Sequence, residues 1–477
     1  DVDGNGYADV VVGSDGYGNG QEYEGRAYVF HGSAAGLSAT AAWTAESDQA
    51  HVGLGASVST AGDVDGDGYA DVAVGAWGAD SEGRAHVYHG SAGGLSATAA
   101  WTEEGDQAGA AFAVPLATAG DVNGDGFSDL IVGAPGFDNG QTNEGRAYLY
   151  HGSAAGLSAA SLWTAEGDQA SSGFGCSVST AGDVNGDGYS DVIVGARHYD
   201  AGQTNEGRAY VHHGSAAGLS ATAAWTAEGD QASAVFGESV STAGDVNGDG
   251  YSDVIVGAYG YDDGEQDEGR AYVYHGSAAG LSPAPAWTAE SDQASAWFGF
   301  SVSTAGDVNG DGYSDVIVGA RAFDNGTTDE GRSYVYHGSA GGLFAIPSWI
   351  AEGDQAGAWF GFSVSTAGDV NGDGYSDVVV GACGHDNGQS EEGRAYVYHG
   401  AAVGLSATAA WTAEGDQAYA NFGTSVATAG DVNGDGYSDL IVGADGFSNG
   451  EAYEGRAYVY HGSAAGLSPA PAWTAES

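Results

Sequence analysis

Lysine is absent from this sequence, and its ten basic residues are all arginines, set against 65 aspartates and glutamates. The formal charge at pH 7 is −55 and the isoelectric point is about 4.1. A chain with this charge repels phosphate backbones and anionic lipid surfaces, so we exclude nucleic acid as a partner. The charge favours neutral molecules, cations and metal ions, among which Ca²⁺ is the leading candidate.

Cysteine, proline and long apolar runs are also scarce. The two cysteines, Cys176 and Cys383, cannot form a disulfide framework. No apolar run of about 18 residues suggests a membrane span. The seven prolines and 86 glycines follow no collagen period, whereas a hydrophobic content of 42% is enough for a packed core. The composition therefore indicates an ordered globular protein in which glycine marks the turns.

A repeated unit of about 62 residues covers almost the whole sequence. Its most regular part is Asp-Val-Asn-Gly-Asp-Gly-Tyr-Ser-Asp or a close variant, which starts at Asp1, Asp63, Asp121, Asp183, Asp245, Asp307, Asp369 and Asp431. The second repeat is shorter because a loop around residues 79–82 is trimmed. We expect a single domain, residues 1–477, with repeats at approximately 1–47 (partial), 48–105, 106–167, 168–229, 230–291, 292–353, 354–415 and 416–477.

Four strands, called A to D, are expected in each repeat. In the fourth repeat they are Ser177–Gly182, Asp191–Ala196, Gly207–His213 and a weaker segment at Ala223–Ala227. Turn-forming residues separate these segments, and no window has a sustained period of 3.6 residues. Helix content should therefore be very low.

Eight four-stranded units of this length suit a β-propeller, whose radially repeated sheets leave only short, protected edges. The small side chains of strand A suit the crowded position nearest the axis. A β-solenoid is the alternative, although solenoid coils are usually shorter, about 20 to 30 residues, and need no hairpins. We predict an all-β fold, an eight-bladed β-propeller with antiparallel four-stranded blades.

The two ends of the sequence fall inside a repeat. The first repeat lacks the stretch that corresponds to residues 168–182, including strand A, and the last repeat stops at Ser477 before that same stretch. We therefore expect a first blade without its inner strand. Because a closed propeller needs that strand, we also expect this sequence to be part of a longer chain that supplies it.

The repeated string has oxygen-bearing side chains at positions 1, 3, 5 and 9 and a backbone carbonyl available at position 7. Hard oxygen ligands at this spacing suit Ca²⁺, and the glycine at position 6 permits the sharp turn that the loop needs. An EF-hand loop would place a glutamate at position 12, where the fourth repeat has Val194 inside an apolar strand. The predicted site is therefore a strand–loop–strand calcium site in which position 9 closes the loop.

Asp-Gly and Asn-Gly pairs also form ordinary hairpin turns, which is the alternative interpretation. Turns alone do not require polar residues at all of these positions in eight copies, so we favour up to eight Ca²⁺, one in each A–B loop. These ions would add 16 charges to a net charge of −55, so metal binding and folding should be coupled. The predicted ligands are Asp1, Asp3, Asn5, Tyr7, Asp9, Asp63, Asp65, Asp67, Tyr69, Asp71, Asp121, Asn123, Asp125, Phe127, Asp129, Asp183, Asn185, Asp187, Tyr189, Asp191, Asp245, Asn247, Asp249, Tyr251, Asp253, Asp307, Asn309, Asp311, Tyr313, Asp315, Asp369, Asn371, Asp373, Tyr375, Asp377, Asp431, Asn433, Asp435, Tyr437 and Asp439.

Two further motifs point to a known family. Phe-Gly-x-Ser occurs at residues 174–177 and 298–301, and Gly-Ala-Pro at residues 133–135, while Leu54 and Ala113 depart from the Phe-Gly pattern. With the calcium loops, these motifs resemble the FG-GAP repeat family, which includes the β-propeller at the head of integrin α subunits. The resemblance implies a calcium-stabilised extracellular or cell-surface module for adhesion. It also implies that the A–B loops lie on one face and the B–C and D–A loops on the opposite, ligand-binding face.

Differences among the repeats cluster in the B–C and D–A loops. Because these loops lie at the same ends of their blades, the variable side chains should gather on one face. Aromatic rings and arginines there suit a sugar or a protein epitope, and the alternative is loop drift after duplication. The candidate ligand-binding residues are Trp77, Arg197, Tyr259, Trp297, Arg321 and Trp359.

Residues that recur in every repeat are interpreted as structural. The eight repeated arginines should each form a charge-assisted bond to an acidic loop, at Asp230 in the fourth repeat or its equivalents. The repeated tryptophans should pack the blades, and the histidines equivalent to His213 should do the same.

We therefore expect a noncatalytic recognition module that binds a protein or a glycan outside the cell or on its surface. One alternative is a structural spacer of a surface protein or filament. The other is a calcium-dependent polysaccharide lyase, in which Arg197, His198, Arg321 and His385 would act on a uronate.

Overall fold

The computed structural model describes residues 1–449 and 454–476, with the backbone alone at Asp80. Within these residues the chain consists of short β-strands, and the one helical element is a 3₁₀ turn, η1 (Ala79–Ser81). This turn lies in the trimmed loop of the second repeat. The expectation of very low helix content is confirmed. No helix in the described ranges has the length and apolarity needed to cross a membrane.

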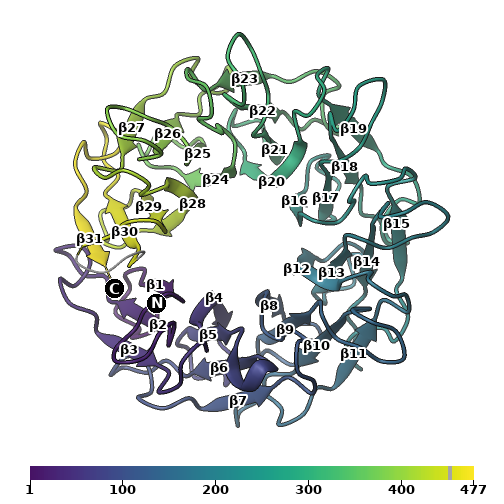
Figure 1. Ribbon diagram of the computed structural model, residues 1–477, viewed down its shortest axis with the longest axis vertical. Coiled ribbons are helices and arrows are strands. Elements are labelled where there is room, and N and C mark those ends of the chain that lie inside the picture. The colour runs from purple at the N-terminus through teal and green to yellow at the C-terminus, as the bar shows by residue number, and fades with distance from the viewer. Residues whose placement is uncertain (450–453, 477) are drawn as a thin grey trace. The chain divides into compact units, whose positions relative to one another are not determined.

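The chain forms two compact units, and the first comprises Asp1–Gly32, Ser38–Val240 and Gly276–Pro283. It holds four antiparallel sheets whose strands follow one another in sequence order (Figure 1). They are β1 (Val10–Ser14), β2 (Arg26–Phe30) and β3 (Trp43–Glu46); β4 (Leu54–Gly62), β5 (Asp71–Ala76), β6 (Arg84–Tyr88) and β7 (Trp101–Glu104); β8 (Leu116–Gly120), β9 (Asp129–Ala134), β10 (Arg146–Tyr150) and β11 (Trp163–Glu166); and β12 (Phe174–Gly182), β13 (Asp191–Ala196), β14 (Arg208–His212) and β15 (Trp225–Glu228).

The second unit comprises Ser33–Leu37, Ser241–His275 and Ala284–Ser477. Its four sheets have the same strand order. They are β16 (Val240–Gly244), β17 (Asp253–Ala258), β18 (Arg270–Tyr274) and β19 (Trp287–Glu290); β20 (Phe298–Gly306), β21 (Asp315–Ala320), β22 (Arg332–Tyr336) and β23 (Trp349–Glu352); β24 (Ser363–Gly368), β25 (Asp377–Ala382), β26 (Arg394–Tyr398) and β27 (Trp411–Glu414); and β28 (Phe422–Gly430), β29 (Asp439–Ala444), β30 (Arg456–Tyr460) and β31 (Trp473–Glu476).

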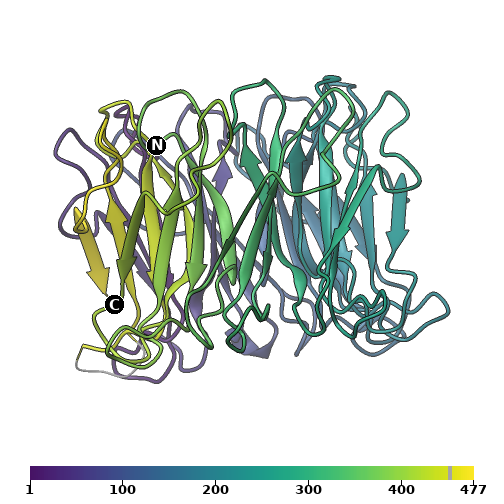
Figure 2. The same cartoon turned by 90° about the horizontal axis from the view of Figure 1, so that it is seen from above.

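One sheet per repeat, with four antiparallel strands in seven repeats and three in the first, confirms the predicted eight-bladed β-propeller fold class. The first sheet lacks strand A, as expected. Within each sheet the strands run between two ends, where loops connect them (Figure 2). In an antiparallel sheet of this order, the A–B and C–D loops lie at one end and the B–C and D–A loops at the other.

The core lies between consecutive sheets, and strand B is its most buried part. In β13 every residue is buried, because sheets cover both of its faces. Trp163 and Phe174 pack with Val192 and Val194, so one cluster joins the third repeat to the fourth. The Nε1 of Trp163 also donates a hydrogen bond to the carbonyl oxygen of Ser220, at 2.9 Å. The repeated tryptophans therefore join neighbouring repeats, as the sequence predicted.

Strand A is longer than predicted in four repeats, where it has nine residues. In β12 it starts at Phe174 rather than Ser177, because a bulge shifts the register between these two residues. Gly175 in this bulge has a φ of +86°, and a Cβ there would lie 2.7 Å from the carbonyl oxygen of Arg146. The glycine of the Phe-Gly motif is therefore required by close backbone approach as well as by its φ.

Candidate metal loops and ligand-binding loops

The A–B loop folds around the carboxylate at its first position. In the fourth repeat the Asp183 carboxylate accepts the backbone N–H groups of Gly186, Asp187 and Gly188, at 2.6, 3.1 and 2.8 Å. The side chain of Asn185 accepts the N–H of Asp187 at 2.9 Å, and the Asp187 carboxylate accepts the N–H two residues further on at 3.1 Å. These bonds form a tight turn in which the predicted ligand residues are held by the loop's own backbone.

Position 9 has a second role that the sequence did not reveal. Asp191 is fully buried, and its two carboxylate oxygens accept the N–H groups of Val184 at 2.9 Å and Gly214 at 2.8 Å. Burial raises the pKa of Asp191 to about 7; these two bonds oppose the shift, and the carboxylates of Asp187 and Asp183 add to it. The position 9 residues that are likewise fully buried are Asp71, Asp129, Asp253, Asp315, Asp377 and Asp439.

Carboxylate oxygens converge most closely in the first two loops, where position 3 is also an aspartate. Asp1, Asp3 and Asp9 bring oxygen atoms within 4.8 Å of one another, and so do the three equivalent aspartates of the second loop, Asp63, Asp65 and Asp71. None of the arginine ion pairs of the described chain involves an A–B loop carboxylate. A group of hard oxygen donors without a neutralising arginine fits Ca²⁺.

The basic side chains beside these loops are the repeated histidines. The Nδ1 of His31 lies 3.1 Å from Asp3, and that of His89 lies 2.9 Å from Asp65. A Cβ on Gly94 of the next repeat would lie 2.7 Å from the His31 ring, so the ring is packed between two loops. Burial lowers the pKa of the equivalent histidines His151, His213, His275, His337 and His399, although nearby carboxylates oppose the shift. The structural interpretation of these histidines agrees with this packing.

Position 7 supplies a packing contact between repeats. A Cβ on Gly124 would lie 2.5 Å from the Cε1 of Tyr189, which belongs to the next loop along the chain. The Tyr189 ring therefore covers the preceding A–B loop, a contact that links neighbouring candidate metal sites. The sequence had indicated only a backbone carbonyl at this position.

The B–C and D–A loops are joined by side-chain bonds at the opposite end of the sheets. Gln141 of the third B–C loop donates to the carbonyl of Asp168 at 2.8 Å and accepts the N–H of Ala170 at 2.9 Å. Gln169 of the same D–A loop is bonded to the backbone of Asp200 in the fourth B–C loop. Each such D–A loop is thus held between the B–C loops of two consecutive repeats.

The structure brings together three of the six candidate ligand residues. The rings of Tyr259 and Trp297 lie 5.9 Å apart, and the Arg321 guanidinium carbon lies 4.4 Å from the centre of the Trp297 ring. Phe300 and Phe362 join this cluster at 4.2 and 5.3 Å from the same carbon. Neither phenylalanine was predicted from the sequence. The signal that could have identified them is that the residue after Phe-Gly differs among the repeats.

The other three candidates have separate surroundings. Trp77 is 44% exposed and lies against Gly53, where a Cβ would meet its ring nitrogen at 2.1 Å. Trp359 lies against Gly384, where a Cβ would meet its ring at 3.0 Å. The Nη1 of Arg197 pairs with Glu238 at 3.0 Å, so its charge is already compensated.

The repeated arginines form the predicted charge-assisted bonds, but with a different partner. Arg208 bonds to Glu228, which lies directly opposite in the β14–β15 register, rather than to Asp230. The guanidinium also lies 3.9 Å from the centre of the Tyr199 ring. The prediction was wrong for Asp230 itself, because strand D begins and ends later than expected, which places its last glutamate beside the arginine. Two equivalents of Asp230 do pair with a repeated arginine: Asp106 lies 3.9 Å from Arg146, and Asp354 lies 4.0 Å from Arg394.

Eight segments of the sequence match two related family profiles. The segments that match the FG-GAP repeat are residues 115–150, 174–212, 236–274, 298–336, 360–398 and 422–460. Those that match the FG-GAP-like repeat are residues 1–74 and 63–132. Together they cover more than half of the sequence. The chain belongs to the FG-GAP repeat family.

Relatives of this FG-GAP chain include integrin α subunits. It is 33% identical over 251 residues to integrin alpha-V of Gallus gallus, a match that covers 50% of this chain and 23% of the relative. It is 38% identical over 161 residues to integrin alpha-3 of Cricetulus griseus, covering 32% and 15%. It is 36% identical over 220 residues to integrin alpha-PS2 of Drosophila melanogaster, covering 43% and 15%. The FG-GAP chain thus spans less than a quarter of the length of these relatives.

One solved structure, BBS1N in complex with ARL6DN, covers 81% of the FG-GAP chain and 88% of its own chain. The TM-score is 0.45 and the identity 12%, a similarity too low to bear on fold or function.

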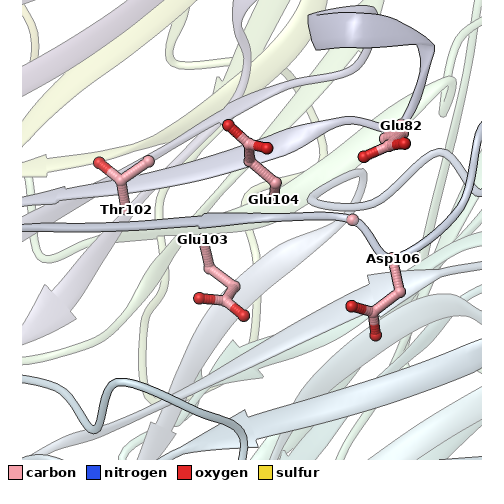
Figure 3. Close-up of a pocket in the computed structure, with 6 residues that line it drawn as sticks. Glu82, Thr102, Glu103, Glu104 and Asp106 are labelled. Atoms are coloured by element: carbon pink, nitrogen blue, oxygen red, sulfur yellow. The ribbon is translucent and has the colours of Figure 1, made fainter.

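An acidic cavity of about 500 Å³ lies beside β7 and is lined by Glu82, Thr102, Glu103, Glu104 and Asp106. Figure 3 shows Glu103 and Asp106 directed to one side of the strand and Glu104 to the other. Burial and the carboxylates of Asp106 and Glu104 raise the pKa of Glu103. Glu103 replaces the alanine found at this place in the other repeats of the FG-GAP chain, and no basic side chain lines the cavity.

Of the residues considered for a lyase, His385 is buried and its Nε2 lies 3.3 Å from Asp354. Burial lowers the pKa of His385 and of His198, and the charge of a nearby arginine lowers each further. Arg197 is ion-paired, as described above. Two of the four residues that a lyase would use, His385 and Arg197, therefore already have carboxylate partners within the chain.

Proposed function

We propose that this FG-GAP chain is a calcium-stabilised recognition module that acts outside the cell or on its surface. Its ligand, a protein or a glycan, binds to the B–C and D–A loops. The observation that carries the proposal is the division between the two ends of the sheets. The A–B loops repeat almost unchanged, whereas aromatic and arginine side chains that occur in only one or two repeats lie in the B–C and D–A loops. The integrin α relatives, which are adhesion receptors, support a role in adhesion.

In the proposed calcium sites, the side chains at positions 1, 3, 5 and 9 and the carbonyl at position 7 hold the ion. Calcium supplies positive charge to a group of carboxylates that has no arginine partner. The buried aspartate at position 9 gains most from that charge, because burial alone disfavours its ionised form. The backbone bonds of each loop keep its oxygens close together before the ion arrives, which reduces the entropy cost of binding.

Calorimetric titration of the chelator-treated protein with CaCl₂ tests the metal part of this proposal. We expect a stoichiometry approaching eight and a melting temperature that rises with calcium concentration. An unchanged melting temperature in EDTA and in millimolar CaCl₂ would overturn it.

A glycan array and a pull-down from extracellular extract test the recognition part. The double variant Trp297→Ala/Trp359→Ala should lose at least tenfold in binding to any ligand found. Val403→Ser is the matched control, because Val403 is 94% exposed but lies in a C–D loop at the other end of the sheet. Equal binding by both variants would remove the B–C and D–A loops from consideration. An empty array and an empty pull-down would favour the spacer, and formation of unsaturated uronides from polyuronate would favour the lyase.

A further inference from the structure

Arg321 differs from every other arginine in its lack of a carboxylate partner. The other nine arginines each lie within 4.0 Å of a glutamate. Arg321 forms no ion pair with any described residue, and its Nε is buried without a hydrogen-bond partner. In a chain with a net charge of −55, a cation without a carboxylate partner is a rare feature.

Aromatic rings surround the Arg321 guanidinium instead. Its central carbon lies 4.4 Å from the ring centre of Trp297, 4.2 Å from that of Phe300 and 5.3 Å from that of Phe362. The rings of Trp297 and Phe300 are nearly parallel, at 24°, and Tyr259 lies 5.7 Å from Phe300. Rings packed on a guanidinium hold its plane in place, while the N–H groups at its outer edge stay free to donate.

Arg197 provides a comparison within the same molecule. It occupies the equivalent place in the B–C loop two repeats earlier, and its Nη1 pairs with Glu238, 41 residues further on. The residue 41 positions after Arg321 is Phe362. The carboxylate that pairs with Arg197 is thus replaced by an aromatic ring near Arg321, and Gly173 and Cys176 stand where the Arg321 site has Trp297 and Phe300.

We infer that Arg321 and its surrounding rings form a subsite for an acidic sugar, whose carboxylate pairs with the guanidinium while its pyranose ring packs against the aromatic side chains. The guanidinium edge matches the two oxygens of a carboxylate, and the flat rings match the C–H faces of a sugar. This inference rests on the proposed recognition function. It concerns a single acidic unit, because the charge of the whole chain disfavours a polyanion.

The test is titration of the calcium-loaded protein with methyl β-D-glucuronide, followed by ligand-observed NMR. Two further probes define the chemistry: methyl β-D-glucoside lacks the carboxylate, and N-acetylaspartate amide lacks the sugar. We expect binding of the glucuronide and at least tenfold weaker binding of both other probes. Absence of glucuronide binding would overturn the inference, and equal binding of the aspartate derivative would overturn the assignment to a sugar in favour of a peptide carboxylate.

Three variants identify the residue responsible. Arg321→Gln and Phe362→Glu should each weaken glucuronide binding at least tenfold, the second by giving Arg321 the partner that Arg197 already has. Val403→Ser, in an exposed C–D loop, is the control and should bind as the parent protein does. Wild-type binding by Arg321→Gln, or equal losses in Arg321→Gln and Val403→Ser, would overturn the inference. Unchanged melting temperatures show that each variant is folded.

The outcomes separate this inference from the recognition function itself. A ligand found on the array whose binding is lost in Trp297→Ala/Trp359→Ala but kept in Arg321→Gln would retain the recognition function and eliminate the subsite. Failure to bind any array ligand, extract protein or glucuronide would eliminate both.

Discussion

Asp191 and Gly214 are joined by a hydrogen bond in which the buried carboxylate accepts the backbone N–H at 2.8 Å. The other carboxylate oxygen accepts the N–H of Val184 at 2.9 Å, so a single side chain fastens the A–B loop to the end of β14. The same pair of bonds recurs, for example, at Asp315 and Asp377. The aspartate at position 9 therefore stabilises the fold whether or not an ion is bound. The aspartate at position 5, Asp187 in this loop, is exposed.

Substitutions at these two positions should separate fold from metal binding. Asp191→Asn places an amide N–H₂ against a backbone donor, so we expect a loss of about 1–3 kcal/mol in the free energy of unfolding at pH 8, in EDTA as well as in calcium. Asp187→Asn keeps an acceptor for the bond it makes at 3.1 Å, so its stability in EDTA should change by less than about 0.5 kcal/mol. It should nevertheless reduce the stabilisation by calcium.

Denaturant unfolding with EDTA and with CaCl₂ measures both effects, and the two variants serve as controls for each other. If Asp187→Asn were as damaging in EDTA as Asp191→Asn, the buried bonds of Asp191 would not be the source of the difference.

The buried aspartates also predict how stability depends on pH. Burial raises the pKa of Asp129, Asp191, Asp315 and Asp377 to about 7, above the value of the unfolded chain. The folded state then holds more protons than the unfolded state, so the stability contributed by these groups falls as pH rises through about 7. We expect the melting temperature in EDTA to decrease from pH 6.5 to 8, and calcium to have its largest effect at pH 8.

The window is chosen to limit the contribution of the histidines. Burial lowers the pKa of His151, His213, His275, His337 and His399, so these groups destabilise the fold as pH falls through about 6.5, and their effect fades above that pH as the unfolded chain loses its histidine protons. Calorimetric scans in EDTA at several pH values test the prediction, and a melting temperature that stays constant or rises between pH 6.5 and 8 would contradict it.

The sheet count and strand order could be predicted because each repeat carries the same local signals. Strands with alternating apolar residues and glycine-rich turns form through contacts between residues that are close in the sequence. With eight copies of each signal, a departure in a single repeat does not obscure the pattern. The three-stranded first sheet followed from the same comparison. The bulge at Gly175 was not predicted, since it depends on the approach of Arg146 from the preceding repeat.

The candidate sites were less predictable because their contacts join distant residues. Arg321 and Phe362 are 41 residues apart, and Phe362 has no polar group that would mark it as part of a site. The same spacing joins Arg197 to Glu238. The sequence predicted Arg197 as a ligand-binding cation, but Glu238 already compensates its charge. Comparison of repeats finds positions that vary, but only the packing of neighbouring sheets shows which of them meet.

The repeated arginine should be far more sensitive to lysine substitution than the arginine of the variable loop. Arg208 is 19% exposed, pairs with Glu228 and stacks 3.9 Å from the Tyr199 ring centre, all of which require a planar guanidinium. We expect Arg208→Lys to cost about 1–2 kcal/mol, since both the ring contact and the fork geometry are lost. Arg197 is 42% exposed, so Arg197→Lys should cost less than about 0.5 kcal/mol. Urea unfolding measures both variants. Equal losses in the free energy of unfolding would show that stacking of Arg208 on the Tyr199 ring does not contribute to stability.

The tryptophan that joins neighbouring repeats should matter less in the third repeat than in the sixth. Trp163 donates to the carbonyl of Ser220 at 2.9 Å, and the Nδ1 of His212 lies 3.0 Å from the same oxygen. Trp349 donates to Ser406 at 2.9 Å, but a tyrosine stands where His212 would be. Trp→Phe removes the same ring volume at both sites, yet the Ser220 carbonyl keeps a partner and the Ser406 carbonyl does not. We therefore expect Trp349→Phe to cost about 1 kcal/mol more than Trp163→Phe, seen as a larger fall in melting temperature in CaCl₂. Identical falls would mean that His212 does not donate to Ser220.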